Sequence, residues 1–201
     1  MTDQNEWARI VLEDPEHSTR YVQRFRDMAA AGHDLAGEAR LVDALVAPGS
    51  RSLDAGCGTG RVGSILARAG HEVVGVDLDP VLVAAAEADH PGSRWILGDL
   101  VGLDLPGHGV TEGFDAIVCA GNVMAFLAPS TRGEVLRRLR GHLRDGGRIV
   151  VGFGAGRGYE VETFLAEVEA AGLVADLLLS TWHLHPYHDG ADFLVAVLRP
   201  R

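Results

Sequence analysis

The chain has 201 residues, of which 47% are hydrophobic and 23% are charged, and this balance is typical of a single compact globular domain rather than a disordered chain. Its formal net charge of −10 disfavours nucleic acid and anionic membranes as partners. All 18 basic residues are arginines, which excludes chemistry that depends on a lysine, such as Schiff-base formation.

Residues 1–47 are predicted to form a helical segment, and residues 48–201 the core of the same domain. Tyr21, Phe25 and Met28 recur at helical spacing, and Gly32 is expected to divide the segment into two helices. The start of the chain is acidic and lacks the charged-then-apolar layout of a signal peptide. No apolar run approaches the ~18 residues of a membrane helix. We therefore expect a cytoplasmic protein without a membrane segment.

From Arg51 onward, short apolar runs alternate with stretches of helical length. Strands are predicted at 52–55, 72–77, 94–97, 114–119 and 148–153, and helices at 62–69, 80–88, 131–145 and 161–172. A capping box at 131–134 is expected to open the third of these helices, which Gly146 should end. Connections of this length imply right-handed crossovers between parallel strands.

The end of the chain follows a different pattern. Two strand-like runs, at 173–181 and 192–198, are joined by about ten residues without a helix, which predicts an antiparallel pair. The predicted fold class is therefore α/β: a doubly wound, mostly parallel sheet with an antiparallel hairpin at its C-terminal edge.

A glycine-rich loop, Leu53-Asp54-Ala55-Gly56-Cys57-Gly58-Thr59-Gly60, joins the first predicted strand to the first helix of the core. Such a turn lets the backbone approach a ligand closely. Asp77 ends the second strand 19 residues beyond Gly58, close to the ~20-residue offset at which a carboxylate binds ribose hydroxyls. Asp99 follows the third strand. These groups share the carboxyl edge of the sheet, which predicts a site for a nucleotide-like ligand.

The spacing of the loop bears on which ligand binds. A dinucleotide fingerprint has two residues before its third glycine, whereas here Gly60 comes one position early and is followed by Arg61. Asp54, just before the loop, suits a ligand with an ammonium group better than a diphosphate. An NAD-linked oxidoreductase is therefore disfavoured, but it stays open as an alternative.

The ordered set of motifs resembles the class I S-adenosylmethionine-dependent methyltransferases. The glycine loop is similar to the first motif of that family, an acidic residue followed by G-x-G-x-G. The resemblance covers about residues 51–153 and continues through Val76-Asp77, Gly98-Asp99-Leu100, Phe114-Asp115-Ala116-Ile117-Val118-Cys119 and Leu143-Arg144-Asp145-Gly146-Gly147-Arg148. It implies a Rossmann-like fold, S-adenosylmethionine as the cofactor, methyltransferase activity, and an N-terminal helical lid over the cofactor.

The resemblance also implies which residues contact the cofactor. Asp54 and the loop backbone would face the methionine moiety, Asp77 the ribose, and Asp99 the exocyclic amine of the adenine. Leu78 would pack against the adenine, Leu100 would offer backbone contacts, and the end of the fourth strand would face the methyl group. The expected cofactor-binding residues are Tyr21, Asp54, Ala55, Gly56, Cys57, Gly58, Asp77, Leu78, Asp99, Leu100, Cys119, Ala120 and Asn122.

No catalytic residue is assigned with certainty, but an oxygen or nitrogen acceptor can require a general base. His183, His185 and His188 are candidates, and Asn122 could orient an acceptor. His183 and His185 would share one face if the strand before them continued, but no third metal ligand is visible and no metal site is predicted. Arg157, in a loop after the fifth strand, could anchor a substrate carboxylate.

The acceptor itself is expected to be a small molecule. The arginine-rich helix near 132–144 lacks interleaved aromatic residues, and Glu134 stands four residues before Arg138, so it is interpreted as a solvated face rather than a nucleic-acid surface. The tetrapeptides that the family uses on nucleic acid or protein are absent. Because the motifs indicate binding rather than turnover, a catalytically silent S-adenosylmethionine sensor stays open as an alternative. The sequence does not indicate which oligomeric state the protein adopts.

Overall fold

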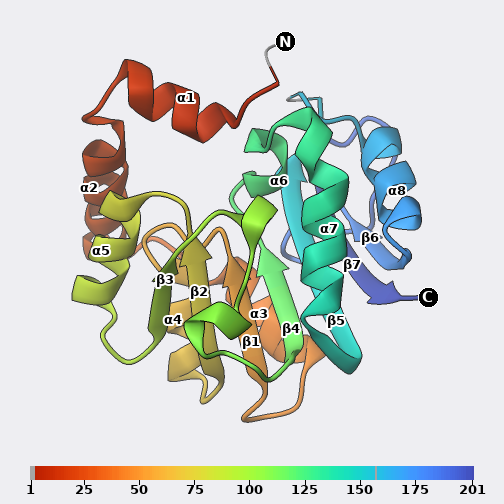
Figure 1. The fold of residues 1–201 in the computed structure, drawn as a ribbon, viewed down its shortest axis with the longest axis horizontal. Coiled ribbons are helices and arrows are strands. Elements are labelled where there is room, and N and C mark those ends of the chain that lie inside the picture. The colour runs from red at the N-terminus through yellow and green to blue at the C-terminus, as the bar shows by residue number, and fades with distance from the viewer. Residues whose placement is uncertain (1–2, 157) are drawn as a thin grey trace.

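The computed structural model describes residues 3–156 and 158–201, and its centre is a seven-stranded sheet in the order β3-β2-β1-β4-β5-β7-β6 (Figure 1). Strand β7 runs antiparallel to both of its neighbours, and the other paired strands are parallel. The strands are β1 (Arg51–Ala55), β2 (Glu72–Asp77), β3 (Arg94–Leu97), β4 (Phe114–Cys119), β5 (Leu143–Gly154), β6 (Leu173–Leu179) and β7 (Phe193–Pro200). The predicted α/β fold with an antiparallel edge pair is confirmed.

Helices cover both faces of this sheet. The helices of the described chain are α1 (Glu6–Glu13), α2 (His17–Ala30), α3 (Gly37–Leu45), α4 (Arg61–Arg68), α5 (Pro80–Asp89), α6 (Val123–Phe126), α7 (Arg132–Gly141) and α8 (Val161–Ala170), with short 3-10 turns η1 (Leu100–Gly102), η2 (Pro106–His108) and η3 (Pro129–Thr131). In Figure 1, α7 lies in front of the sheet and α3 lies behind it.

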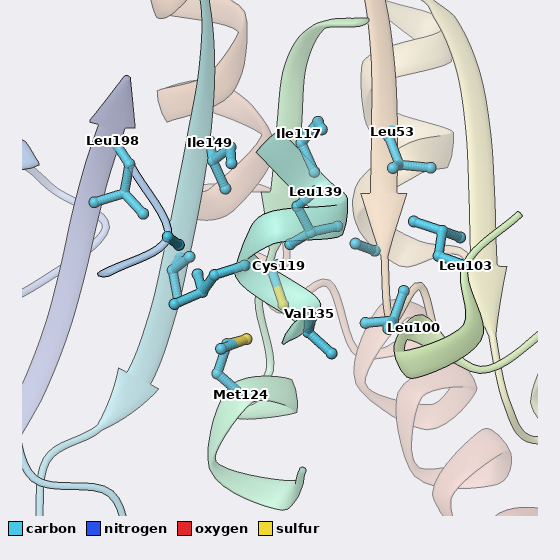
Figure 2. Close-up of a cluster of buried hydrophobic side chains, with 14 of the residues drawn as sticks. Leu53, Leu100, Leu103, Ile117, Cys119, Met124, Val135, Leu139, Ile149 and Leu198 are labelled. Carbon is cyan, nitrogen blue, oxygen red and sulfur yellow. The ribbon is translucent and has the colours of Figure 1, made fainter. Parts of the chain in front are cut away.

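Alternate side chains of each strand build two separate cores, one on each face. On one face, strand residues such as Leu53, Ile117 and Ile149 pack against Val135 and Leu139 of α7, and all five are almost fully buried (Figure 2). The strand side chains that point to the other face, such as Val118 and Val150, pack against Val42 of α3 and Leu66 of α4. This strict alternation fixes the register of the strands, because a slip of one residue would exchange the two faces.

The N-terminal segment forms three helices instead of the two predicted. The additional break lies at Asp14, which has an extended backbone and precedes Pro15, a position where proline disfavours helical geometry. Helices α1 and α2 lie at the carboxyl edge of the strands (Figure 1). Helix α3 belongs instead to the core, because Leu41 and Val42 are buried against α4 and the sheet.

The region around α7 differs from the prediction in two ways. The expected capping box is not formed, because the Thr131 hydroxyl donates to the carbonyl of Ala128 at 2.8 Å and Glu134 pairs with arginines of its own helix. The helix ends at Gly141 rather than near Gly146. The following residues already pair with β4, starting at Leu143 opposite Phe114, and β5 is therefore five residues longer at its start than predicted.

Strand β6 also ends earlier than predicted, at Leu179 rather than Thr181. The chain then turns through Leu184, one of two non-glycine residues with a positive φ (67°) among those described. Because the strand stops there, the condition under which His183 and His185 would share a strand face is not met.

Candidate functional site

A pocket opens at the carboxyl edge of the sheet, between the glycine loop and the helices α1 and α2. It encloses about 840 Å³ of space including its open mouth. The predicted cofactor-binding residues that line it are Tyr21, Asp54, Gly56, Cys57, Gly58, Asp77, Leu78, Asp99, Leu100 and Ala120. The structure thus brings most of the predicted set together at one edge of the sheet, as the parallel topology requires.

Three predicted residues lie elsewhere. The side chains of Ala55 and Cys119 are fully buried in the core beneath the pocket, and burial raises the pKa of the Cys119 thiol to about 12. Asn122 lies just past β4 in a left-handed conformation, and its amide oxygen accepts a hydrogen bond of 2.6 Å from the Gly154 backbone. Asn122 lines a neighbouring pocket instead of this one.

The glycines of the loop serve two different purposes. A Cβ atom on Gly56, whose φ is 79°, would lie 2.4 Å from a methyl carbon of Val123, so this glycine permits close packing of α6. A Cβ atom on Gly58 would find its nearest neighbour, the Tyr21 ring, only at 3.9 Å. The space at Gly58 therefore opens into the pocket and leaves room for a ligand against the backbone.

Asp54 lies at the base of the pocket with only 2% of its surface exposed. Its carboxylate accepts a hydrogen bond of 2.8 Å from the backbone N–H of Gly63, in the first turn of α4. Burial raises the pKa of Asp54 to about 7, although the Gly63 hydrogen bond and the positive charge of Arg61 oppose the shift. A cationic ligand group would stabilise the ionised form, so this carboxyl group is poised to change its protonation when such a ligand binds.

Asp77 ends β2 and joins the glycine loop to the start of α5. One carboxylate oxygen accepts from the Gly58 backbone at 2.8 Å, and the other accepts from the Asp79 backbone at 2.9 Å. Burial raises the pKa of Asp77, and these backbone hydrogen bonds oppose the shift. Each oxygen keeps a further lone pair, so hydroxyl groups in the pocket can still donate to it.

Asp99 lies across the pocket at the end of β3. It caps the η1 turn by accepting a hydrogen bond of 3.0 Å from the backbone of Val101, and the residue remains exposed. Leu78 and Leu100 line the same side of the pocket and provide an apolar surface there.

Two residues near the start of the chain also line this pocket and were not predicted from the sequence: Asn5, which caps α1, and Trp7 on α1. The Trp7 indole N–H donates to Asp79 at 2.8 Å, and its ring lies edge-on to Tyr21 with the centroids 5.1 Å apart. Phe126 of α6 lies 6.1 Å from the Trp7 ring on the opposite wall. No periodic pattern links Trp7 to a residue 72 positions away, so its contact with Asp79 could not be predicted from the sequence.

Arg61 also lines the pocket, and its role in packing was not predicted. Its guanidinium binds both oxygens of Glu38 at 2.8 and 2.5 Å and the carbonyl of Leu35 at 2.7 Å. The side chains of this pair are 19% and 15% exposed. The bidentate pair fixes α3 to the end of the glycine loop, and it leaves the charge of Arg61 already compensated.

A second pocket adjoins the first and encloses about 1110 Å³ of space including its open side. Both pockets are lined by Trp7, Tyr21, Phe25, Gly121 and Phe126, so these residues form a shared wall. The second pocket adds residues that the first lacks: Ile10, His17, Arg20, Arg24 and Asn122. The two pockets therefore lie side by side at the same edge of the sheet.

The predicted base candidates lie away from both pockets. His183, His185 and His188 are exposed on the turn between β6 and β7, and none of them lines either pocket. Among the residues described, no group of three or more histidine, cysteine or acidic side chains is arranged to hold a metal ion. Arg157, predicted as a substrate anchor, lies outside the described residues.

Two further observations concern possible partners. Within the described parts of the chain, no helix is both long enough and apolar enough to cross a membrane. On α7, Arg138 pairs with Glu134 at 2.9 Å, as the spacing predicted. Arg132 was expected on the solvated face of this helix, but it is buried, with its guanidinium over the Tyr159 ring at 4.0 Å.

Comparisons with known proteins find similarity to methyltransferases. The family model described as a methyltransferase domain matches residues 53–147. A solved structure, the TehB-like S-adenosylmethionine-dependent methyltransferase of Corynebacterium glutamicum, is 46% identical with a TM-score of 0.88, over 94% of this chain and 100% of that chain.

Two curated relatives are similar over shorter stretches. An uncharacterized methyltransferase of Mycobacterium tuberculosis is 34% identical over 55% of this chain and 54% of its own length. The magnesium-protoporphyrin O-methyltransferase of Rhodobacter capsulatus is 34% identical over 66% of this chain and 57% of its own. The matches thus span only about half the length of these curated relatives. Taken together with the fold and the pocket, the comparisons show that the chain belongs to the class I S-adenosylmethionine-dependent methyltransferases.

Proposed function

We propose that this protein transfers a methyl group from S-adenosylmethionine to a small-molecule acceptor. The observation that carries the proposal is the pair of adjoining pockets at the carboxyl edge of the sheet, with the wall of Trp7, Tyr21 and Phe126 shared between them. The first pocket has the groups that the cofactor requires, and the second is open and large enough for a small molecule.

The cofactor fits the first pocket by its chemistry. The buried Asp54 suits the ammonium group of the methionine moiety, and Asp77 suits the ribose hydroxyls. Asp99 can accept from the amine of the adenine, which would lie along Leu78 and Leu100. The open space at Gly58 leaves room for the cofactor against the backbone.

When bound, S-adenosylmethionine supplies an activated methyl carbon, to which an acceptor lone pair bonds as the carbon–sulfur bond breaks and leaves S-adenosylhomocysteine. The chain's contribution is alignment and exclusion of water. Trp7, Tyr21 and Phe126 form an aromatic wall that limits solvent at the junction of the pockets. Among the described residues that line the two pockets, the one histidine is His17, which favours it over His183, His185 and His188 as a proton acceptor.

The pocket also argues against a dinucleotide. The one cationic side chain among its described lining residues is Arg61, and Glu38 already compensates its charge. A diphosphate would instead lie near Asp54 and Asp77, two buried carboxyl groups, and like charges in a buried site repel strongly. NAD is therefore a poorer ligand for this pocket than a sulfonium with an ammonium group.

The experiment that tests the proposal is a transfer assay with methyl-labelled S-adenosylmethionine and a panel of small hydroxy, amino and carboxylic acid acceptors. The proposal predicts label in at least one acceptor together with stoichiometric S-adenosylhomocysteine. Cofactor binding without transfer to any acceptor would favour a catalytically silent sensor instead. A Trp7→Ala variant is the matched control, because it opens the shared wall and should lower transfer without changing the fold of the core.

A further inference from the structure

The second pocket has an uneven charge distribution. Arg20, Arg24 and His17 line it, and no aspartate or glutamate does among the residues described. The whole chain carries a net charge of −10, so a cluster of basic groups here runs against the general field of the protein. Local cations in a cleft raise the concentration of anions at its mouth.

The two arginines differ in their partners. Arg20 pairs with Asp14 at the surface, where its side chain is 59% exposed, and such pairs contribute little to stability. No carboxylate among the described residues pairs with Arg24. Its guanidinium lies over the rings of Tyr21 and Phe25, at 4.9 and 5.2 Å from their centroids. Arg24 is thus held beside the shared aromatic wall with its hydrogen-bond donors still available.

Asp14 pairs with Arg20 and lies near His17, but no carboxylate among the described residues pairs with Arg24. Glu13 pairs with Arg9 on the outer side of α1, and Glu16 is exposed at the start of α2 and does not line the pocket. The carboxyl groups of Asp54 and Asp77 line the other pocket, on the far side of the shared wall. The second pocket therefore favours an anion while the first favours a cation.

Asn122 is a further polar residue that lines the second pocket. Its left-handed backbone (φ 66°) and its hydrogen bond to the Gly154 backbone fix the side chain in place. Because the amide oxygen is the acceptor in that bond, the amide NH₂ is left to donate toward the pocket that Asn122 lines. The position offers a second hydrogen-bond donor to an acidic ligand.

We infer that the acceptor is a planar organic acid, whose carboxylate binds Arg24 and Arg20 and whose ring lies against Trp7 and Phe126. This inference rests on the proposed function and names the substrate class of the same site. Arginine matches a carboxylate with two parallel hydrogen bonds, and aromatic rings provide a flat apolar surface for a planar ligand. A neutral analogue would lose the paired hydrogen bonds with arginine and keep the contacts with the aromatic rings.

The test is calorimetry of the full chain saturated with S-adenosylhomocysteine. The probes are benzoate, phenylacetate and indole-3-acetate, each compared with its own carboxamide. We expect at least one carboxylate to bind about tenfold or more tightly than its amide, and the preference to fall below about threefold in Arg20→Gln/Arg24→Gln. Arg24→Lys should keep part of the preference. Arg137→Gln, an exposed arginine on α7, is the matched control and should keep all of it.

The ratio of the two affinities separates recognition of charge from a structural effect, because a disturbed lid would weaken acid and amide alike. Carboxylates that bind no better than their amides, or a preference that the double variant retains, would overturn the inference while the methyltransferase proposal stands. Failure of S-adenosylhomocysteine itself to bind would instead overturn both.

Discussion

The indole N–H of Trp7 donates a hydrogen bond of 2.8 Å to the carboxylate of Asp79, and this contact joins α1 to the start of α5 across 72 residues of sequence. Asp79 is 3% exposed, and its other oxygen accepts from the backbone of Val81 and so caps α5. The hydroxyl of Ser18 on α2 donates to the same oxygen as Trp7. One buried carboxylate therefore joins α1 and α2 to the start of α5.

Trp7→Phe removes this hydrogen bond and keeps most of the ring. We expect the affinity for S-adenosylmethionine to fall about fivefold, a loss of ~1 kcal/mol, because one hydrogen bond that positions the lid is lost. Amide hydrogen exchange along α1 should rise in the same variant. Trp182→Phe is the control, since Trp182 packs near β5 away from the pocket; equal losses in both variants would contradict the role of the lid.

Asp77→Asn tests the ribose contact. The variant has one side-chain oxygen in place of two, so it keeps only one of the hydrogen bonds from the Gly58 and Asp79 backbones. It also loses the charge that strengthens a hydrogen bond from a hydroxyl group. We expect cofactor affinity to fall at least about tenfold, or ~1.4 kcal/mol. Circular dichroism would confirm that the variant is folded. An affinity equal to that of the unchanged protein would remove Asp77 from the site.

The pH dependence of stability tests the environment of Asp54. Its pKa rises from 3.8 to about 7 on folding, so between these values the folded chain keeps a proton that the unfolded chain has released. The free energy of unfolding should therefore fall as pH rises from about 4 to 7 and level off above that. Asp54→Asn removes this contribution. Urea unfolding gives the difference in stability between the variant and the unchanged protein, and we expect this difference to favour the variant more at pH 7.5 than at pH 4.5. The same difference at both pH values would contradict the raised pKa of Asp54.

The same shift predicts proton release when the cofactor binds. An ammonium group beside Asp54 stabilises the carboxylate, so its pKa should fall and a proton should leave near pH 7. The measurement is calorimetry in buffers of different ionisation enthalpy, where the observed heat should depend on the buffer. Asp54→Asn should lose that dependence. A buffer-independent heat for the unchanged protein would place the ammonium group elsewhere.

Substitution of the loop glycines separates packing from ligand access. Gly56→Ala combines a positive φ with a Cβ atom 2.4 Å from Val123, and we expect it to cost well over the ~1–2 kcal/mol of backbone strain alone. Gly32→Ala has a similar φ (75°) with nothing within 4 Å and gives the strain alone. Gly58→Ala should resemble Gly32→Ala in thermal stability but lose cofactor affinity. Equal melting temperatures for all three variants would contradict this division.

The carboxyl edge of the sheet was predictable because parallel topology is a strong constraint. Once β1, β2 and β3 are recognised, Asp54, Asp77 and Asp99 must lie near one another, whatever the details of packing. The packing of the N-terminal helices against the core was harder to predict. Helical spacing identified Tyr21, but the contact of Trp7 with Asp79 depends on how α1 folds back over the core, and no local pattern encodes that.

The three histidines near the end of the chain were predicted as candidates for the site, but they line neither pocket. Three histidines near 183–188 suggested a functional cluster, but strand β6 ends at Leu179 and the chain turns outward before reaching them. The end of α7 was misplaced for a related reason. Leu143 fits the apolar face of a helix as well as that of a strand, and only its pairing with Phe114 decides between the two.

The most direct test of the central claim is calorimetric titration of the protein with S-adenosylmethionine, S-adenosylhomocysteine and NAD in parallel. We expect micromolar binding of both sulfur compounds, about −8 kcal/mol, and no detectable binding of NAD. Binding of NAD alone would mean that the pocket of Asp54 and Asp77 accepts a diphosphate, and the proposed function would fall.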